Sequence, residues 1–245
     1  MAPHSVNGKV ALITGANKGI GLEIARQLGR QSMTVLLGAR DEGRGQAAAE
    51  KLRADGMDAR PIQLDVTSQE TIDQAAHRIE KEFGRLDVLV NNAGIFIDDA
   101  PPSELDMKML RRTYETNLFG PVAVTQAMLP LLRRSLAGRI VNMSSGLGSL
   151  TQTSDPGWEF SHLNLLAYNS SKTALNAATI EFAKELRGTL VKINSADPGY
   201  TATDMNNHQG PRSVEQGARV AVRLATLPDD GPTGGFFDEN GVLPW

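Results

Sequence analysis

The chain of 245 residues contains no cysteine. This absence excludes disulfide bonds, thiolate catalysis and cysteine-bound zinc, although it does not by itself identify a cellular compartment. The four histidines, His4, His77, His162 and His208, are scattered without the spacing typical of metal ligands. We therefore expect no metal centre.

An excess of positive charge and long apolar runs are also lacking. The formal net charge is -3 and the pI is about 5.8, so we expect no basic surface for nucleic acid or an anionic membrane. No apolar run approaches the roughly 20 residues that cross a bilayer, and residues 1–9 contain no apolar signal core. These absences predict a cytoplasmic protein that binds neither nucleic acid nor membrane.

What is present is a series of short runs rich in Val, Ile and Leu, separated by longer segments with helical periodicity. The predicted strands are residues 9–13, 33–38, 59–64, 86–90, 138–142 and 191–195, with a weaker seventh at 234–237. The predicted helices are residues 20–30, 44–54, 69–82, 108–134, 165–186 and 214–225. This alternation is typical of a parallel sheet covered by helices on both faces. The sequence therefore predicts one α/β domain over residues 1–245, a doubly wound Rossmann-type fold with ligands at the carboxyl ends of its strands.

A glycine-rich turn follows the first predicted strand. Residues 14–21 read Thr-Gly-Ala-Asn-Lys-Gly-Ile-Gly and lead directly into a helix. Such glycines allow a tight turn and a close approach to a pyrophosphate, and the helix N-terminus favours an anion. A merely structural turn is the alternative, but the position at the first strand–helix junction favours dinucleotide binding. The predicted contacts in this turn are Gly15, Asn17, Lys18, Gly19, Ile20 and Gly21.

The end of the second strand bears on which dinucleotide would bind. NAD-binding proteins usually have a carboxylate here for the adenosine ribose, and Ala39 cannot supply one. Arg40 and Lys18 can instead pair with a 2'-phosphate, which predicts NADP(H). The alternative is that both are solvated surface charges, and Asp41 leaves some use of NAD open.

Polar and small residues follow the third and fourth strands as well. Asp65 could accept a hydrogen bond from the adenine amine, and the sequence Asn-Asn-Ala-Gly at 91–94 would let the backbone lie against the cofactor. Ordinary turn chemistry explains each one alone, but they recur at the same end of successive strands. The predicted cofactor contacts here are Asp65, Val66, Asn91, Ala93 and Gly94.

Tyr168 and Lys172 are four positions apart, so on a helix they lie on one face. Alone, this spacing would equally describe a surface tyrosine beside a surface lysine. The fifth strand, however, ends in Met-Ser-Ser, and Ser145 comes to the same sheet edge as the glycine turn. These three residues are the candidate catalytic group.

Five motifs thus occur in order over about residues 8–240: the glycine turn, Asn-Asn-Ala-Gly, Ser145, Tyr-x-x-x-Lys, and the Pro-Gly pair at 198–199. In them the chain resembles the short-chain dehydrogenase/reductase family. Lys18, residues 39–41 and the ending Gly-Gly-Phe-Phe to Pro-Trp at 234–245 further resemble its NADPH-dependent carbonyl-reductase branch.

The resemblance implies an NADPH-dependent oxidoreductase that reduces aldehydes or ketones reversibly to alcohols. Tyr168 would protonate the substrate oxygen as hydride arrives, while Ser145 holds that oxygen. Lys172 would reach the ribose hydroxyls and favour the phenolate of Tyr168, whose unperturbed pKa is about 10. Asn117 would hold a water in the proton relay to Lys172; a capped or kinked helix is the alternative reading of that residue.

The resemblance also assigns the segment after the sixth strand. Pro198, Gly199, Thr201 and Thr203 would cover the nicotinamide and reach toward the pyrophosphate, unless the Pro-Gly pair is a turn without a ligand. Residues 200–212 would form a mobile lid over the substrate.

The sequence departs from the common family pattern between Ser145 and Tyr168, where the gap is longer than in many members. We expect the inserted residues 154–162 to roof a pocket for a hydrophobic carbonyl substrate, although ordinary packing explains their aromatic residues about as well. The predicted substrate contacts are Phe96, Leu147, Trp158, Phe160, Tyr200 and Met205.

Two other function classes stay open. A non-catalytic NADP-binding regulator or sensor would be expected to lose the tyrosine, lysine or serine, and a lyase or epimerase commonly has a longer C-terminal substrate domain. The family usually assembles through the helices equivalent to residues 108–134 and 165–186. A homodimer or homotetramer is therefore expected, although an insertion nearby can interfere with it.

Overall fold

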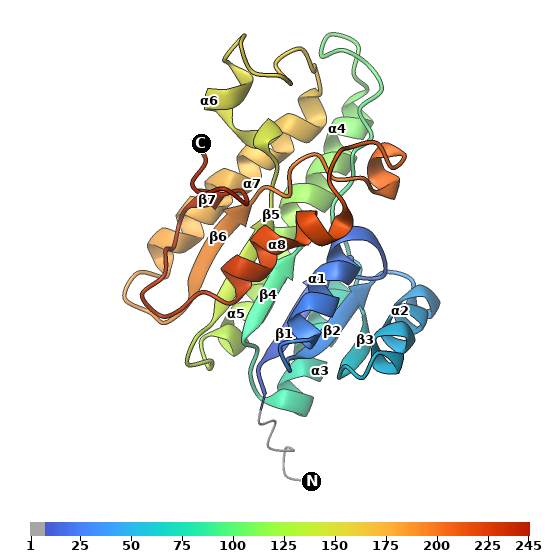
Figure 1. Cartoon of the computed structure of the whole chain (residues 1–245), viewed down its shortest axis with the longest axis vertical. Coiled ribbons are helices and arrows are strands. Elements are labelled where there is room, and N and C mark those ends of the chain that lie inside the picture. Colours follow the sequence, from blue (N-terminus) through green and yellow to red (C-terminus); the bar gives the residue numbers. More distant parts are fainter. Residues whose placement is uncertain (1–7) are drawn as a thin grey trace.

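Seven parallel strands form one sheet at the centre of the computed structural model, which describes residues 8–245 (Figure 1). The strands lie in the order β3-β2-β1-β4-β5-β6-β7, which confirms the predicted fold. Their bounds are β1 Val10–Thr14, β2 Thr34–Ala39, β3 Ala59–Gln63, β4 Val88–Asn91, β5 Arg139–Met143, β6 Lys192–Ala196 and β7 Phe236–Phe237. The predicted strand ends differ from these by at most two residues, because pairing with the neighbouring strand sets the ends.

Helices cover both faces of the sheet. The helices α1 (Gly19–Gly29), α2 (Glu42–Ala54) and α8 (Val214–Ala225) pack on one face. On the other face lie α3 (Gln69–Phe83), α5 (Gly120–Leu132) and α7 (Leu166–Glu185), with α4 (Met107–Tyr114) beside α7. The inner strands β1, β2 and β4 are buried on both sides between the two helical layers, so they read as nearly continuous apolar runs, whereas the edge strand β3 is partly exposed.

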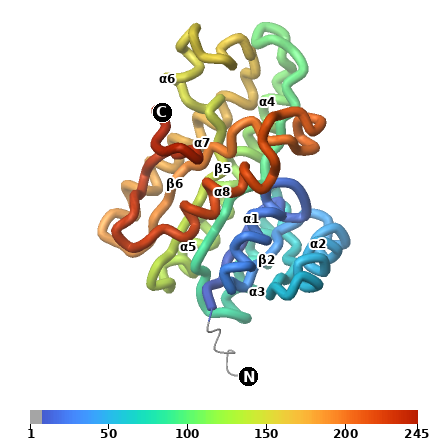
Figure 2. Tube along the Cα trace, in the orientation of Figure 1, coloured from blue at the N-terminus to red at the C-terminus, as the bar shows by residue number. Residues whose placement is uncertain are grey.

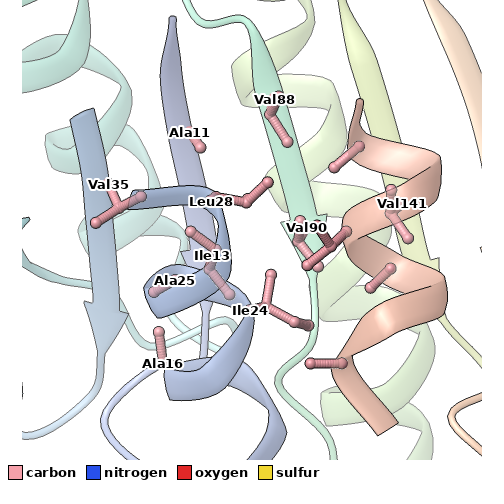
Figure 3. Packing of buried hydrophobic residues seen from close by; sticks show 14 of the residues in the cluster. Ala11, Ile13, Ala16, Ile24, Ala25, Leu28, Val35, Val88, Val90 and Val141 are labelled. Carbon is pink, nitrogen blue, oxygen red and sulfur yellow. The ribbon is translucent and has the colours of Figure 1, made fainter. Parts of the chain in front are cut away.

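The two cores use alternate residues of the same strands. In β1, Ala11 and Ile13 belong to the core under α1, whereas Val10 and Leu12 belong to the opposite core. Figure 3 shows Ile13 and Val90 facing Ile24 of α1. Burying an aliphatic side chain of this size stabilises the fold by about 1.5–3 kcal/mol, so the sheet is a rigid base for the loops at its edge.

The helix predicted over residues 108–134 is not continuous. Between α4 and α5, residues Glu115–Phe119 form a π-helical turn, η1, in which the N–H of Gly120 bonds the carbonyl of Glu115. Pro121 has no N–H and cannot continue the regular hydrogen-bond ladder of an α-helix. The prediction of one helix was therefore wrong in this detail.

Three short helical segments were not predicted. They are η2 (Gly146–Gly148), α6 (Leu150–Thr153) and η3 (Asp204–Asn206). Figure 2 shows the chain around α6 next to the loop that precedes α4, at the end of the molecule opposite the N-terminal end of β1. Within residues 8–245, no helix is both long and apolar enough to cross a membrane.

Candidate active site

The turn after β1 is held against the end of β4. Gly15 has a φ of +64°, and a Cβ there would lie 3.0 Å from the Cα of Ala93. The Asn92 amide donates to the Thr14 carbonyl over 2.9 Å, and the Thr14 hydroxyl accepts from the N–H groups of Asn92 and Ala93. A Cβ on Gly21 would collide with the Asn92 side chain. The glycines therefore permit a close backbone approach that other residues would block.

The N-terminus of α1 is open. Its N-cap residue, Lys18, makes no capping hydrogen bond, and its first turn contains no acidic residue. By contrast, side chains cap the first turns of α2, α3, α4 and α8; they are Asp41, Ser68, Asp106 and Ser213. The unsatisfied N–H groups and the dipole of α1 fit a pyrophosphate at this point.

The two cations predicted to bind a 2'-phosphate, Arg40 and Lys18, differ in whether they already have a partner. Arg40 is exposed and makes no hydrogen bond or ion pair with any residue from 8 to 245. Lys18 donates to the carboxylate of Asp204 over 2.6 Å, and Asp204 also pairs with His208 at 3.0 Å. Lys18 would have to leave Asp204 to meet a phosphate, which the sequence did not indicate.

Several predicted cofactor contacts have side chains that are already hydrogen-bonded within the protein. Asn91 is buried and donates to Thr125 and Asn142, and the Thr201 hydroxyl donates to the carbonyls of Pro198 and Gly199. The Asp65 carboxylate accepts from the N–H and the hydroxyl of Thr67. Asn91 and Thr201 could therefore meet a cofactor only through their backbones.

Other predicted contacts lie close to the glycine turn. The Thr203 methyl group lies 3.9 Å from the Cβ position of Gly19, and Gly94 lies beside Asn117 and Lys172. Val66 is buried against Gly120. Asn17 and Ile20 are partly exposed in the turn itself.

The structure brings the catalytic candidates together. The Lys172 ammonium lies 5.5 Å from the centre of the Tyr168 ring and donates to the carbonyl of Met143 over 2.8 Å. The Ser145 hydroxyl is close enough to the phenol of Tyr168 to lower its pKa. Helix α7 thus presents its tyrosine and lysine to the end of β5, where the serine is.

Asn117 lies at the centre of the π-helical turn and is fully buried. Its side-chain oxygen accepts from the N–H of Ile95 over 2.8 Å, and its amide donates to the Ile95 carbonyl and to the Ser171 hydroxyl. Because Pro121 lacks an N–H, the carbonyl of Asn117 receives no bond from the residue four positions on. The π-helical turn therefore carries Asn117, whose side chain joins the β4 loop to α7.

Burial changes the proton affinities of the pair. It raises the pKa of Tyr168 to about 12, with a further contribution from Asp197, while the nearby Ser145 hydroxyl acts in the opposite direction. Burial also lowers the pKa of Lys172 to about 8, and Asp197 opposes that change. Burial is the largest cause of the raised pKa of Tyr168, because it disfavours the charged phenolate. That Lys172 favours the phenolate stays a prediction.

Two acidic residues at the site were missed by sequence reasoning. The carboxylate of Asp98 accepts from the N–H of Ala167 over 2.7 Å and from that of Tyr168 over 3.0 Å, so it caps α7 from the β4 loop. Asp197 lies beside Tyr168 and Lys172 at the end of β6. The one available sign was Leu165, which precedes α7 and cannot cap it.

The predicted substrate residues form two aromatic groups, and two further residues, Leu147 and Met205, lie outside them. Phe96 packs edge-on to Tyr168 with ring centres 5.3 Å apart. Phe160 lies 5.3 Å from Trp158 and 6.0 Å from Tyr200, so the inserted segment meets residues 200–212. The Trp158 ring is 3.5 Å from the Cβ position of Gly146. Leu147 is partly buried beside that glycine, and Met205 is largely exposed.

No group of three or more His, Cys, Asp or Glu side chains that could hold a metal ion occurs in the described part of the chain.

Residues 9–213 match the family model described as short chain dehydrogenase. The chain belongs to the short-chain dehydrogenase/reductase family. The resemblance seen in the motifs is thereby confirmed, and the protein is an oxidoreductase of this family.

Relatives in this family include carbonyl reductases. The chain is 35% identical to "Carbonyl reductase [NADPH] 1" of Mus musculus, over 96% of this chain and 98% of the mouse protein. It is also 35% identical to "Short-chain dehydrogenase/reductase 1" of Saponaria officinalis, over 97% and 96% of the two chains. The structure of an NADPH-bound carbonyl reductase from chicken fatty liver superposes with a TM-score of 0.85 at 27% identity, covering 98% of this chain and all of the other.

Proposed function

We propose that the protein is an NADPH-dependent carbonyl reductase that converts aldehydes or ketones to alcohols, reversibly. The observation that carries the proposal is the convergence of Tyr168, Ser145 and Lys172 beside the open N-terminus of α1. The names of the relatives support it, because they combine the same family with NADPH and a carbonyl substrate.

The cofactor would be held by the glycine turn and by cations. The first-turn N–H groups of α1 would bind the pyrophosphate, and Arg40 would pair with the 2'-phosphate. Lys18 would join Arg40 after leaving Asp204. Bound NADPH supplies the hydride.

The protein groups would handle the proton. The Tyr168 hydroxyl donates its proton to the carbonyl oxygen as the carbon accepts hydride, so the C=O group becomes CH–OH and Tyr168 becomes a phenolate. Ser145 donates a hydrogen bond to the same oxygen and fixes its position. Protonated Lys172 stabilises the phenolate until it regains a proton. With a pKa of about 12, Tyr168 stays protonated at neutral pH, which favours the reducing direction.

The substrate would be an apolar carbonyl compound. Trp158 and Phe160 of the inserted residues 154–162, with Tyr200 of the proposed lid 200–212, would cover it, and Phe96 would contact it beside Tyr168. Their aromatic surfaces favour a hydrophobic substituent next to the carbonyl carbon.

The test is NADPH oxidation, followed by nicotinamide absorbance, with a panel of activated ketones and aromatic aldehydes of increasing size. We expect turnover with NADPH, weaker turnover with NADH, and a change of selectivity toward bulky ketones in Trp158→Ala. If the protein binds NADPH but turns over no carbonyl compound, the non-catalytic sensor is the better reading. Unchanged selectivity in Trp158→Ala would remove the proposed roof.

A further inference from the structure

Lys172 is a buried cation without a carboxylate partner. Only 5% of the residue is exposed, and within residues 8–245 its ammonium bonds a single acceptor, the carbonyl of Met143. No acidic side chain of that range lies within ion-pair distance of it. Because a buried ammonium is costly unless a negative charge compensates it, the nearest carboxylate matters to its protonation.

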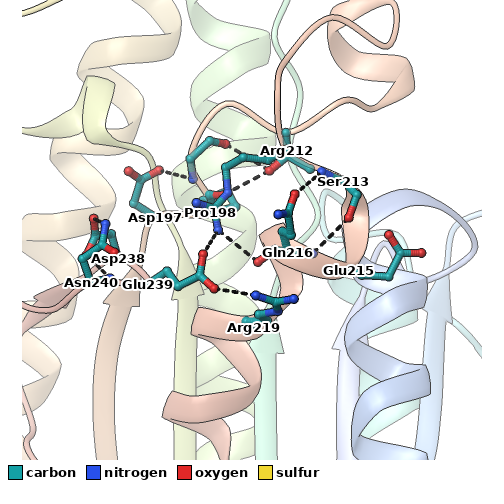
Figure 4. Close-up of polar contacts among 12 residues, drawn as sticks. Asp197, Pro198, Arg212, Ser213, Glu215, Gln216, Arg219, Asp238, Glu239 and Asn240 are labelled. Atoms are coloured by element: carbon teal, nitrogen blue, oxygen red, sulfur yellow. Dashed lines mark hydrogen bonds and ion pairs between the residues drawn. The ribbon is translucent and has the colours of Figure 1, made fainter.

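The carboxylate whose charge acts on Lys172 belongs to Asp197. Met143, whose carbonyl accepts from Lys172, is paired with Ala196 across β5 and β6. Asp197 is the next residue after Ala196, so it follows β6 at the level of that carbonyl. One carboxylate oxygen accepts from the N–H of Gly199 over 3.0 Å, as Figure 4 shows. The other lies 3.2 Å from the Cβ position of Gly146. Asp197 is thus fixed between the loop of Ser145 and the Pro198–Gly199 turn.

The other charged groups around Asp197 are already paired or have the same sign. Arg212 approaches from the end of residues 200–212, but its guanidinium is bound to Glu239, which also pairs with Arg219 at 2.9 Å (Figure 4). Burial raises the pKa of Asp197, and the negative charge of Asp238 in the C-terminal segment adds to this, whereas the bond from Gly199 and the charge of Arg212 lower it. Tyr168 and Lys172 face it from α7. Lys172 is therefore the positive neighbour that no other carboxylate neutralises.

We propose that Asp197 is a positioning residue whose carboxylate charge keeps Lys172 protonated beside Tyr168. The inference rests on the proposed reductase function, because it concerns the ammonium that stabilises the phenolate after proton transfer. Burial alone lowers the pKa of Lys172, and Asp197 acts against it. Without this charge, a larger fraction of Lys172 would be neutral at pH 7 to 8, and the phenolate would lose its counter-charge.

The decisive variant is Asp197→Asn, which keeps an oxygen that can accept from Gly199 but removes the charge. We expect the titration of Lys172, followed by NMR of isotope-labelled lysine side chains and assigned with Lys172→Met, to move to lower pH. An unchanged titration would overturn the proposal. Asp230→Asn removes one charge from an exposed position without hydrogen bonds or ion pairs in the described chain, and it should leave the titration of Lys172 unchanged.

Turnover gives a second readout. In Asp197→Asn the alkaline limb of the kcat profile for carbonyl reduction should move to lower pH. At a fixed pH on that limb, the rate should fall about tenfold for every pH unit by which the limb moves. An identical profile would contradict the proposal.

Two controls keep the proposal decidable. NADPH binding of wild-type affinity shows that Asp197→Asn is folded, and Asp197→Ser tests the same charge if Asp197→Asn does not fold. A wild-type protein without carbonyl activity would refute the proposed function. The NMR titration needs no turnover, so it would still test the effect of Asp197 on Lys172.

Discussion

Helices α1 and α7 both begin at the carboxyl edge of the sheet without a capping side chain of their own, but only one of them stays open. The residues before them, Lys18 and Leu165, make no capping hydrogen bond. At α1 the N–H groups are unsatisfied within the described chain. At α7 two of them are bound by Asp98, which lies 70 positions before Tyr168.

The difference in capping follows from the different roles proposed for the N-termini of α1 and α7. A helix N-terminus that binds an anion cannot also be capped by a side chain, since the two compete for the same N–H groups. A helix that carries the reacting phenol gains from a fixed first turn, because small displacements of a proton donor slow proton transfer. The comparison predicts that substitutions can separate the two roles. Changes near the N-terminus of α1 should weaken cofactor binding, and changes near the N-terminus of α7 should slow the reaction.

The largest effect is expected for Tyr168→Phe. Removing the hydroxyl removes the proton donor and leaves the ring, so carbonyl reduction should fall by about 10³-fold. NADPH affinity, measured by quenching of protein fluorescence, should change little.

Tyr114→Phe is the matched control, because it removes a phenol hydroxyl that makes no hydrogen bond in the described chain. It should keep the wild-type rate. If Tyr168→Phe retained most of its turnover, another group would have to be the acid. The assignment of the chemical step to α7 would then be wrong.

The next effect concerns the cofactor side. Arg40→Ala removes an exposed guanidinium that would pair with the 2'-phosphate, and it should weaken NADPH binding about ten- to a hundredfold with little change for NADH. At saturating NADPH, kcat should be close to wild type. Arg30→Ala removes an exposed arginine next to the other end of α1 and should leave both affinities unchanged. Equal losses for NADPH and NADH in Arg40→Ala would contradict the phosphate assignment.

The sequence predicts the sheet well because each strand is a short apolar run that must be buried on both faces. It also places the candidates on one edge, since parallel strands end together and motifs such as Tyr-x-x-x-Lys are local in the chain. Fold and family are confirmed, whereas the roles of the individual side chains are still predictions.

Pairings between distant positions could not be predicted in this way. Lys18 and Asp204 are 186 positions apart, and neither flanking sequence indicates the ion pair. Asp98 and Asp197 look like ordinary loop residues until the fold brings them to α7. The high pKa of Tyr168 likewise depends on burial by several segments, which a four-residue spacing does not contain.

The smallest effect is expected at the cap of α7. Asp98→Ala leaves two N–H groups of the first turn unsatisfied, which should cost about 1 kcal/mol and lower the melting temperature by about 2–4 °C. Amide exchange at Ala167 and Tyr168 should become faster, and kcat should fall severalfold while NADPH affinity is kept. Asp98→Asn retains one good acceptor and should be intermediate. The neighbouring exposed Asp99 makes no hydrogen bond in the described chain, so Asp99→Ala should match wild type. If Asp98→Ala lost stability but kept its full kcat, Asp98 would be a structural cap only. The capping of α7 would then make no contribution to the rate.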